Sequence, residues 1–105
     1  MATIKLTHDS EHSLEMFMDY CASNFGNKAC KKLQDKINKK IVQLAQFPLS
    51  CSPEPYLYGH PENYRSCVIQ KPIKMIYHYV EAIDTLYIDN FWDMRRNPDA
   101  LKGDI

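Results

Sequence analysis

The sequence predicts one small α+β domain over residues 1–105, laid out as β-α-α-β-β-β, with a helical hairpin packed on an antiparallel sheet. Two patterns predict this fold class. In the first half of the chain, apolar residues recur at steps of three and four, which places them on one face of a helix. From residue 64 onward they alternate or cluster in short β-rich runs, as strands do. The hydrophobic content of 45% is enough for one core, and the length leaves no room for a second domain.

The beginning of the chain is expected to hold a strand and a first helix. Residues 3–7 alternate in polarity, which predicts a short edge strand. Asp9 or Ser10 can cap the helix that follows, because a short polar side chain accepts a hydrogen bond from the free N–H groups of the first turn. Gly26 tolerates the left-handed backbone that ends a helix, so we expect the first helix to stop there.

A second helix is predicted from about residue 28 to residue 46. Leu33, Ile37 and Leu44 fall at helical spacing on it. The helix should end before Pro48, since proline disfavours helical geometry in the residue that precedes it. Each helix carries one apolar stripe that it cannot bury alone, so the two helices should pack together as an antiparallel hairpin.

The second half of the chain predicts a long loop and then the sheet. Residues 48–63 hold four of the six prolines, which excludes a helix or a central strand and is typical of a functional or partner-facing loop. Three β-rich runs with short connections follow, at residues 64–69, 73–80 and 83–92, and they predict an antiparallel meander. The polar tail from residue 93 should be irregular or form a short helical turn.

Charge is balanced over the chain but segregated along it. Thirteen basic and thirteen acidic residues give a formal net charge of zero, which weakens any general affinity for nucleic acid. The second helix nevertheless carries lysines at positions 28, 31, 32, 36, 39 and 40, interrupted by a single acid. A solvated helix face is the ordinary explanation. The alternative is a docking face, including Lys32 and Lys36, for an acidic protein segment or for phosphate.

The sequence predicts no metal, cofactor, secretion signal or membrane span. The four cysteines form no C-x-x-C pair and no zinc-finger spacing with histidines, so reduced and mostly buried thiols are expected. His8 and His12 are four residues apart, but the first helix should begin between them, which argues against a metal site. We see no signal peptide and no apolar run that approaches a membrane span, and therefore expect a cytoplasmic protein.

Four segments, in this order, resemble the RelE/ParE toxin superfamily. LAQFP at 44–48 resembles the exit of that family from its second helix, and NYRSCVI at 63–69 resembles its aromatic-arginine entry into the sheet. IKMIYHYV at 73–80 is similar to the central strand of the family, and RRNPDAL at 95–101 to its arginine-rich ending. Each segment is weak alone, but together the resemblance covers residues 3–101.

The resemblance implies the toxin component of a type II toxin–antitoxin system, of the plasmid-stabilisation type. Such a toxin is neutralised by a cognate antitoxin and can form an oligomer with it. ParE-like members inhibit DNA gyrase, whereas RelE-like members cleave mRNA on the ribosome, and fold resemblance cannot choose between them. Net neutrality and the lack of a dense basic and tyrosine cluster in the last strands favour the ParE-like action. The alternatives are a RelE-like, metal-independent endonuclease and a toxin fold without toxicity.

Arginines are the first candidates for chemistry if the chain is a nuclease. By its motif position, Arg65 matches the arginine that family ribonucleases place near the scissile phosphate, and Arg95 or Arg96 would supply a second cation. Weaker candidates are Lys71, Lys74, His78 and Tyr87. Ordinary structural roles compete with these assignments. Arg65 can form an ion pair across the sheet, and His78 can be a half-buried, hydrogen-bonded residue.

The end of the last strand is the place where we expect a partner to bind. Arg95 and Arg96 follow this strand, and long cationic side chains there can reach a phosphate or a carboxylate. Trp92, the only tryptophan, either packs in the core or anchors an antitoxin helix. The antitoxin is expected to bind a stripe between the helical hairpin and the sheet, near Trp92 and the 48–63 loop.

Overall fold

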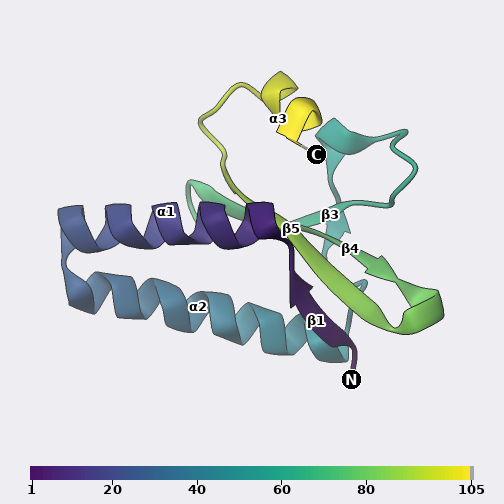
Figure 1. Cartoon of the computed structure of the whole chain (residues 1–105), viewed down its shortest axis with the longest axis horizontal. Helices are drawn as coiled ribbons and strands as arrows, with labels where there is room; N and C mark the ends of the chain where they lie inside the picture. The colour runs from purple at the N-terminus through teal and green to yellow at the C-terminus, as the bar shows by residue number, and fades with distance from the viewer. Residues whose placement is uncertain (105) are drawn as a thin grey trace.

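The computed structural model describes residues 1–104 and contains one five-stranded sheet and three α-helices (Figure 1). Along the chain, the elements are β1 (Thr3–Leu6), α1 (His8–Phe25), α2 (Asn27–Gln46), β2 (Ser52–Pro53), β3 (Arg65–Gln70), β4 (Ile73–Val80), β5 (Thr85–Asp93) and α3 (Asp99–Asp104). Two single-turn 3-10 helices, η1 (Pro55–Leu57) and η2 (Glu81–Ile83), lie in the connections. The strand order across the sheet is β1-β5-β4-β3-β2.

The predicted fold class is confirmed, but the sheet is mixed. β3, β4 and β5 form the expected antiparallel meander. β1 pairs in parallel with β5, with Thr3 opposite Thr85 and Leu6 opposite Ile88, so the prediction of a wholly antiparallel sheet is wrong. No tight turn joins β1 to β5, and therefore no connection forces these two strands to run in opposite directions. The 48–63 loop also contributes a strand, because β2 pairs with β3 at the other edge.

Capping chemistry sets the limits of the helical hairpin. Thr7, and not Asp9 or Ser10, is the N-cap of α1, because its hydroxyl accepts a hydrogen bond from Ser10 N at 3.2 Å. Gly26 has a φ of 87°, in the region that favours glycine, and its N–H donates to Ala22 O. This single residue separates α1 from α2, so the two helices fold back on each other as predicted (Figure 1).

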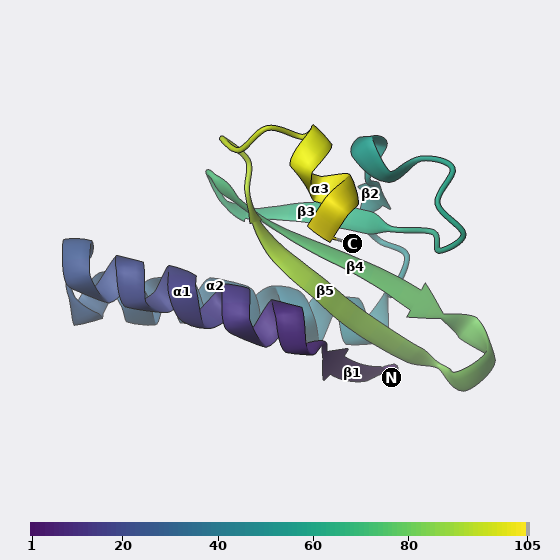
Figure 2. The same cartoon turned by 45° about the horizontal axis from the view of Figure 1, so that its top comes forward.

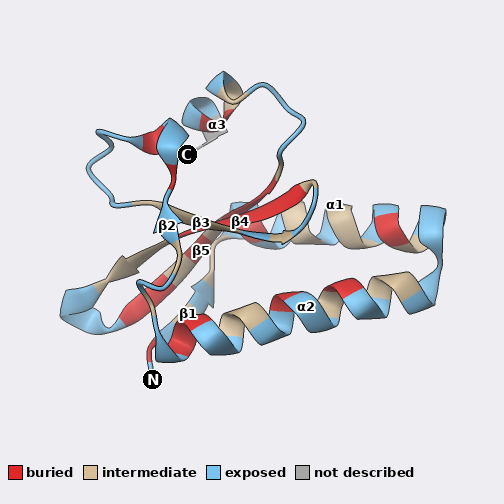
Figure 3. Cartoon of the chain, turned by 180° about the vertical axis from the view of Figure 1, so that it is seen from behind, coloured by how far each residue is buried: buried red, intermediate tan, exposed pale blue. Residues whose placement is uncertain are grey.

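The helical hairpin covers one face of the sheet, which we call the inner face (Figure 2). Leu33, Ile37 and Leu44 of α2 are each at most 2% exposed. They pack in one cluster with Met75 and Tyr77 of β4, both of which are 0% exposed. Figure 3 shows this burial as red stretches on β4, β5 and one side of α2. Removing this apolar surface from water is the main favourable contribution to folding.

A smaller cluster covers part of the opposite, outer face. Ile76 and Trp92 pack there with Leu57 of η1 and Leu101 of α3. Trp92 is 2% exposed and Leu101 is 0% exposed. Figure 2 shows α3 and the loop that holds β2 on the side of the sheet away from the helical hairpin. β4 is therefore packed on both faces over its first half.

Tyr77 ties the chain that leaves α2 to the centre of the sheet. Its hydroxyl donates a hydrogen bond to Pro48 O at 2.8 Å. Burial raises the pKa of Tyr77 far above its usual value, so the hydroxyl keeps its proton and remains a donor. This contact fixes the start of the long loop and so helps to position the residues that follow it.

Replacing Leu44 with alanine tests the inner core. Leu44 is 0% exposed, and Leu44→Ala should lower the free energy of unfolding by roughly 3 kcal/mol, because it removes buried methyl groups and leaves a cavity. Val42, on the same helix, is 55% exposed, and Val42→Ala should change stability by less than about 0.5 kcal/mol. Urea unfolding followed by circular dichroism measures both. Equal effects of the two substitutions would contradict this account of the core.

Candidate functional site

A histidine and an aspartate form a close pair on the outer face of the sheet. His78 Nδ1 of β4 lies 2.6 Å from Asp89 Oδ2 of β5, and the two side chains are 15% and 12% exposed. Tyr87 stacks on the imidazole with ring centroids 5.2 Å apart, and Tyr64 meets it edge-on at 5.4 Å. Glu62 Oε2 lies 4.0 Å from Nε2. The imidazole therefore has a carboxylate near each nitrogen and an aromatic ring on two sides.

The pair favours a charged imidazole. Its hydrogen bond to Asp89 raises the pKa of His78, against the opposing effect of burial. Burial raises the pKa of Asp89, while His78 acts to lower it. Because the ionised carboxylate of Asp89 favours the protonated imidazole, His78 keeps its proton to a higher pH than an isolated histidine would. The expected half-buried, hydrogen-bonded histidine is confirmed.

Lys74, a weaker candidate for chemistry, forms a buried ion pair. Its Nζ lies 2.8 Å from Glu54 Oε2, and the Glu54 side chain is 0% exposed. The ammonium also lies 5.4 Å from the centroid of the Tyr56 ring. Glu54 in turn caps η1, where its carboxylate accepts a hydrogen bond from Tyr56 N at 3.2 Å. Lys74 therefore holds the loop against β4.

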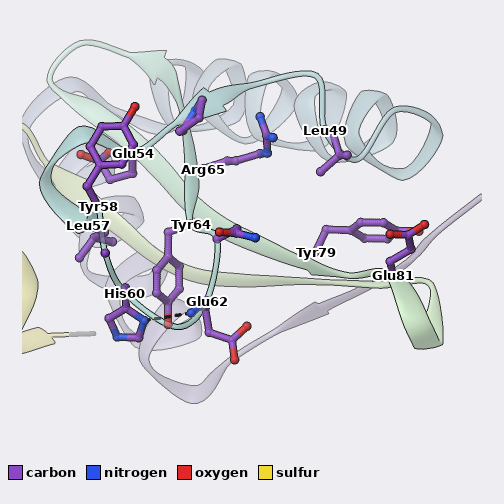
Figure 4. Close-up of a pocket in the computed structure, with 13 residues that line it drawn as sticks. Leu49, Glu54, Leu57, Tyr58, His60, Glu62, Tyr64, Arg65, Tyr79 and Glu81 are labelled. Carbon is purple, nitrogen blue, oxygen red and sulfur yellow. Dashed lines mark hydrogen bonds between the residues drawn. The ribbon is translucent and has the colours of Figure 1, made fainter.

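A pocket of about 320 Å³ lies beside the same loop (Figure 4). Arg65 extends from β3 toward Leu49, while Tyr64 and His60 lie at another side of the pocket. The rings of His60 and Tyr64 meet edge-on at 4.8 Å. Because Tyr64 also contacts His78, the pocket and the His78–Asp89 pair share one wall.

The structure does not bring Arg65 together with Arg95 and Arg96. Arg65 lies opposite Tyr77, in the middle of β4, whereas the two later arginines follow β5, whose last residue pairs with the first residue of β4. Four residue positions along a strand span about 13 Å. Arg65 Nη1 donates a hydrogen bond to Cys51 O at 2.6 Å, which ties its guanidinium to the backbone rather than to a carboxylate.

Arg95 and Arg96 are exposed after β5, as expected, and each contacts a neighbour in the chain. Arg95 donates through Nε and Nη2 to the Asp93 carboxylate at 3.0 and 2.9 Å, and this hydrogen bonding lowers the pKa of Asp93. The Arg96 guanidinium lies 4.3 Å from the centroid of the Trp92 ring. Trp92 itself is buried, so it packs in the core and the proposed role as an exposed anchor is wrong.

An apolar groove of about 640 Å³ lies between α1 and the turn from β3 to β4. Met16, Tyr20 and Phe25 line it from α1 and are 60%, 55% and 67% exposed. Charged residues of both signs also line it, namely Asp9, Lys71, Asp93, Arg95 and Arg96. The groove does lie between the hairpin and the sheet, as expected. Neither Trp92 nor any residue of the 48–63 loop, which the sequence placed near the antitoxin site, lines this groove.

The lysines predicted for the second helix lie on the surface of α2. Lys32 and Lys36 are both exposed. Lys36 Nζ donates a hydrogen bond to Gln70 Oε1 at 2.7 Å, which links α2 to the end of β3. The exposed apolar side chains of the groove, Met16, Tyr20 and Phe25, lie on α1, whereas these lysines lie on α2, so the two helices of the hairpin carry chemically distinct surfaces.

Cysteines and histidines form no metal site in the part of the chain that the structure describes, where no three His, Cys, Asp or Glu side chains are suitably grouped. His8 and His12 both lie on α1, because the helix begins at His8 and not between them. Burial, and then the neighbouring Cys51, raise the pKa of Cys67 to about 12, so this thiol is a poor nucleophile at neutral pH. No described helix has the length and apolar character needed to cross a membrane.

Sequence reasoning missed two carboxylates and the apolar lining of the groove on α1. Glu54 lies in a proline-rich loop without periodicity, so nothing in the sequence pairs it with Lys74. Asp89 gave a weak signal, since it lies two residues after Tyr87 and alternation puts both on one face of a strand. Met16 and Tyr20 are four residues apart on a helix, and this second apolar stripe on α1 was the available sign of the groove.

The raised pKa of His78 predicts how stability depends on pH. A folded-state pKa above the unfolded value of about 6.5 means that the stabilising contribution is complete below that pH and is lost as pH rises through the folded-state pKa. We therefore expect the free energy of unfolding to fall above about pH 6.5 in the native chain, and to fall less in His78→Gln. Urea unfolding at a series of pH values measures this, with His8→Gln, on exposed α1 surface, as control. An unchanged profile in His78→Gln would contradict the assignment.

Comparison with known proteins identifies the family. A family model described as the ParE toxin of the type II toxin–antitoxin system parDE matches residues 4–98. No curated protein matches the chain. Among solved structures, a chromosomal ParDE toxin–antitoxin system from P. aeruginosa has a TM-score of 0.70 at 16% identity, covering 90% of this chain and 98% of that chain. A metal-bound toxin from Helicobacter pylori has a TM-score of 0.65 at 19% identity, covering 89% and 94%.

These two structural likenesses establish the fold alone, because both identities are low. The family model carries the assignment further, since it spans nearly the whole chain and includes the helical hairpin and the meander. The resemblance in the four sequence segments is thereby confirmed at the level of the family. The chain belongs to the ParE toxin family of type II toxin–antitoxin systems.

Proposed function

We propose that this chain is a cytoplasmic toxin that inhibits growth by a ParE-like action on DNA gyrase and is neutralised by a cognate antitoxin. The proposal follows from membership of the ParE toxin family. In it the toxin acts by binding, and not through chemistry of its own. Arg95 and Arg96, which are exposed and adjoin the apolar groove, are proposed to contact the target.

The separation of the three arginines is the observation that supports a binding function. A metal-free ribonuclease needs several cations gathered at the scissile phosphate, together with an acid and a base. Arg65 is bound to the carbonyl of Cys51 and lies opposite the middle of β4, whereas Arg95 and Arg96 lie beyond the end of β5. Lys74, a further candidate cation, is neutralised by buried Glu54. This arrangement favours an inhibitor over a nuclease.

The apolar groove along α1 is the proposed site for the antitoxin. Exposed large apolar side chains are costly in water, and a groove that contains three of them fits an amphipathic segment of a partner. The cations Lys71, Arg95 and Arg96 line the same groove and would pair with acidic residues of that segment. An antitoxin bound there would also cover the two arginines proposed to contact the target, which gives a physical route to neutralisation.

A second candidate function is RelE-like cleavage of mRNA, and one observation favours it. The His78–Asp89 pair, with Tyr87 stacked on the imidazole, has the geometry of a general acid–base group held by a carboxylate. Arg65 would then have to leave the Cys51 carbonyl to reach a phosphate. Induced expression without the antitoxin separates the candidates. Filamentation and DNA damage support the first, an early halt in translation with mRNA cuts supports the second, and unaffected growth supports a toxin fold without toxicity.

Replacing both exposed arginines tests the proposed contact with gyrase. Purified native chain should block DNA supercoiling by gyrase, and Arg95→Ala with Arg96→Ala should weaken the block by about tenfold or more, since each hydrogen bond to a charged group is worth roughly 1.5–3 kcal/mol. The supercoiling assay measures the concentration for half inhibition. Lys102→Ala, on exposed α3, is the control. If the double variant inhibits gyrase as strongly as the native chain, these arginines do not contact the target.

A charge placed in the groove tests the antitoxin site. Met16→Glu should lower antitoxin affinity by about two orders of magnitude, because a carboxylate would have to be desolvated within an apolar contact. Val42→Glu changes an equally exposed apolar residue on α2 and should leave the affinity unchanged. Titration calorimetry with the antitoxin encoded beside the toxin gene measures both, after circular dichroism shows that each variant is folded. Equal affinities for the two variants would place the antitoxin elsewhere.

A further inference from the structure

α2 presents a row of lysines to solvent. Lys28, Lys32, Lys36 and Lys39 follow each other at steps of four, four and three, so they share one face of the helix, and all four are exposed. We call these four residues the lysine row. It extends over about 16 Å of helix, at a rise of about 1.5 Å per residue. Leu33, Ile37 and Leu44 turn toward the core, whereas the row lies on another, exposed face of α2, where only Lys36 reaches the sheet, at Gln70.

The lysine row has little compensating negative charge. Asp35 is the single acidic residue of α2, which carries six lysines and a net charge of +5 in a chain whose net charge is zero. Among residues 1–104, no ion pair joins a lysine of α2 to a carboxylate. Lys36 instead donates to the neutral side chain of Gln70. Positive potential is therefore concentrated on one helix, where it can steer a polyanion toward the molecule.

The composition of this surface indicates which polyanion it fits. Protein interfaces are enriched in aromatic side chains and depleted in lysine, whereas interfaces with nucleic acid are polar and strongly positive. Val42 is the one large apolar side chain of α2 that is exposed, and it lies beyond the last lysine of the row. The groove along α1, by contrast, offers three exposed large apolar side chains, Met16, Tyr20 and Phe25. An acidic protein segment would find apolar contacts on α1, but almost none along the lysine row.

We propose that the lysine row binds the phosphate backbone of duplex DNA, so that the toxin engages gyrase together with the DNA segment that gyrase holds. Over the length of the row, B-DNA presents roughly five phosphates on each strand, which is enough to face all four ammonium groups. The identity of the DNA, as the substrate of gyrase, rests on the proposed function. Contact between the lysine row and a DNA backbone does not depend on it.

Two charge-reversal pairs test the contact. The row pair, Lys32→Glu with Lys39→Glu, alters the lysine row. The control pair, Lys5→Glu with Lys102→Glu, makes the same change in net charge on β1 and α3, where both lysines are exposed. Fluorescence anisotropy with a short labelled DNA duplex, over a series of salt concentrations, measures binding. We expect the native chain to bind more weakly as salt rises. The row pair should weaken binding by about tenfold or more and reduce the slope of log K against log salt by about two, while the control pair should have a much smaller effect.

Four results would overturn the proposal. The first is native binding that is absent at low salt or insensitive to salt. The second is an equal loss in both pairs, which would reflect net charge and not a local surface. The third is tighter binding to duplex RNA of the same sequence than to DNA. The fourth is loss of antitoxin affinity in the row pair with DNA binding intact, which would identify the occupant as an acidic protein.

Supercoiling assays distinguish failure of this inference from failure of the proposed function. If the native chain does not inhibit gyrase, but the row pair selectively loses DNA binding, the proposed function fails and the DNA contact stands. If the native chain inhibits gyrase and the row pair inhibits it equally well, the action on gyrase stands and the role of the lysine row in it is wrong. If the row pair loses DNA binding and gyrase inhibition together, the result supports both the proposed action on gyrase and the DNA contact of the lysine row.

Discussion

Burial of β4 on both faces is the constraint on which the rest of the structure depends. Met75 and Tyr77 are completely buried beneath the helical hairpin, and Ile76 between them is completely buried on the other face. A strand in this position needs a cover on each side. The hairpin supplies the inner cover, and α3 with η1 supplies the outer one. Because the outer cover is small, the two polar pairs that involve β4, Lys74–Glu54 and His78–Asp89, lie at the edge of this cover.

The polar side chains of β4 follow from this incomplete cover. Lys74 lies under the loop that carries η1, and it is buried only because Glu54 neutralises it at 2.8 Å. His78 lies farther along the strand, where Asp89 on the neighbouring strand and two tyrosine rings surround it. The first pair holds the loop in place. The second leaves a half-buried imidazole held by a carboxylate, which is the one chemical feature that favours a nuclease.

The helical hairpin has a second consequence, because its two helices present different surfaces. α1 leaves Met16, Tyr20 and Phe25 in a groove that a protein segment can fill. α2 presents lysines that lack carboxylate partners within the described chain. A formal net charge of zero conceals this division, since acidic residues elsewhere balance the lysines of α2. Charge distribution, and not total charge, therefore decides what this small domain can bind.

The sequence by itself determined the elements that depend on local spacing. It predicted the hairpin hinge at Gly26, the lysines of α2 and the three strands of the meander, since periodicity and backbone preference act over a few residues. Tertiary structure alone decided the parallel pairing of β1 with β5, the burial of Trp92 under α3 and the distance between Arg65 and Arg95. These three features depend on which segments meet across the sheet. The residue pattern along one segment does not specify which other segment it will contact.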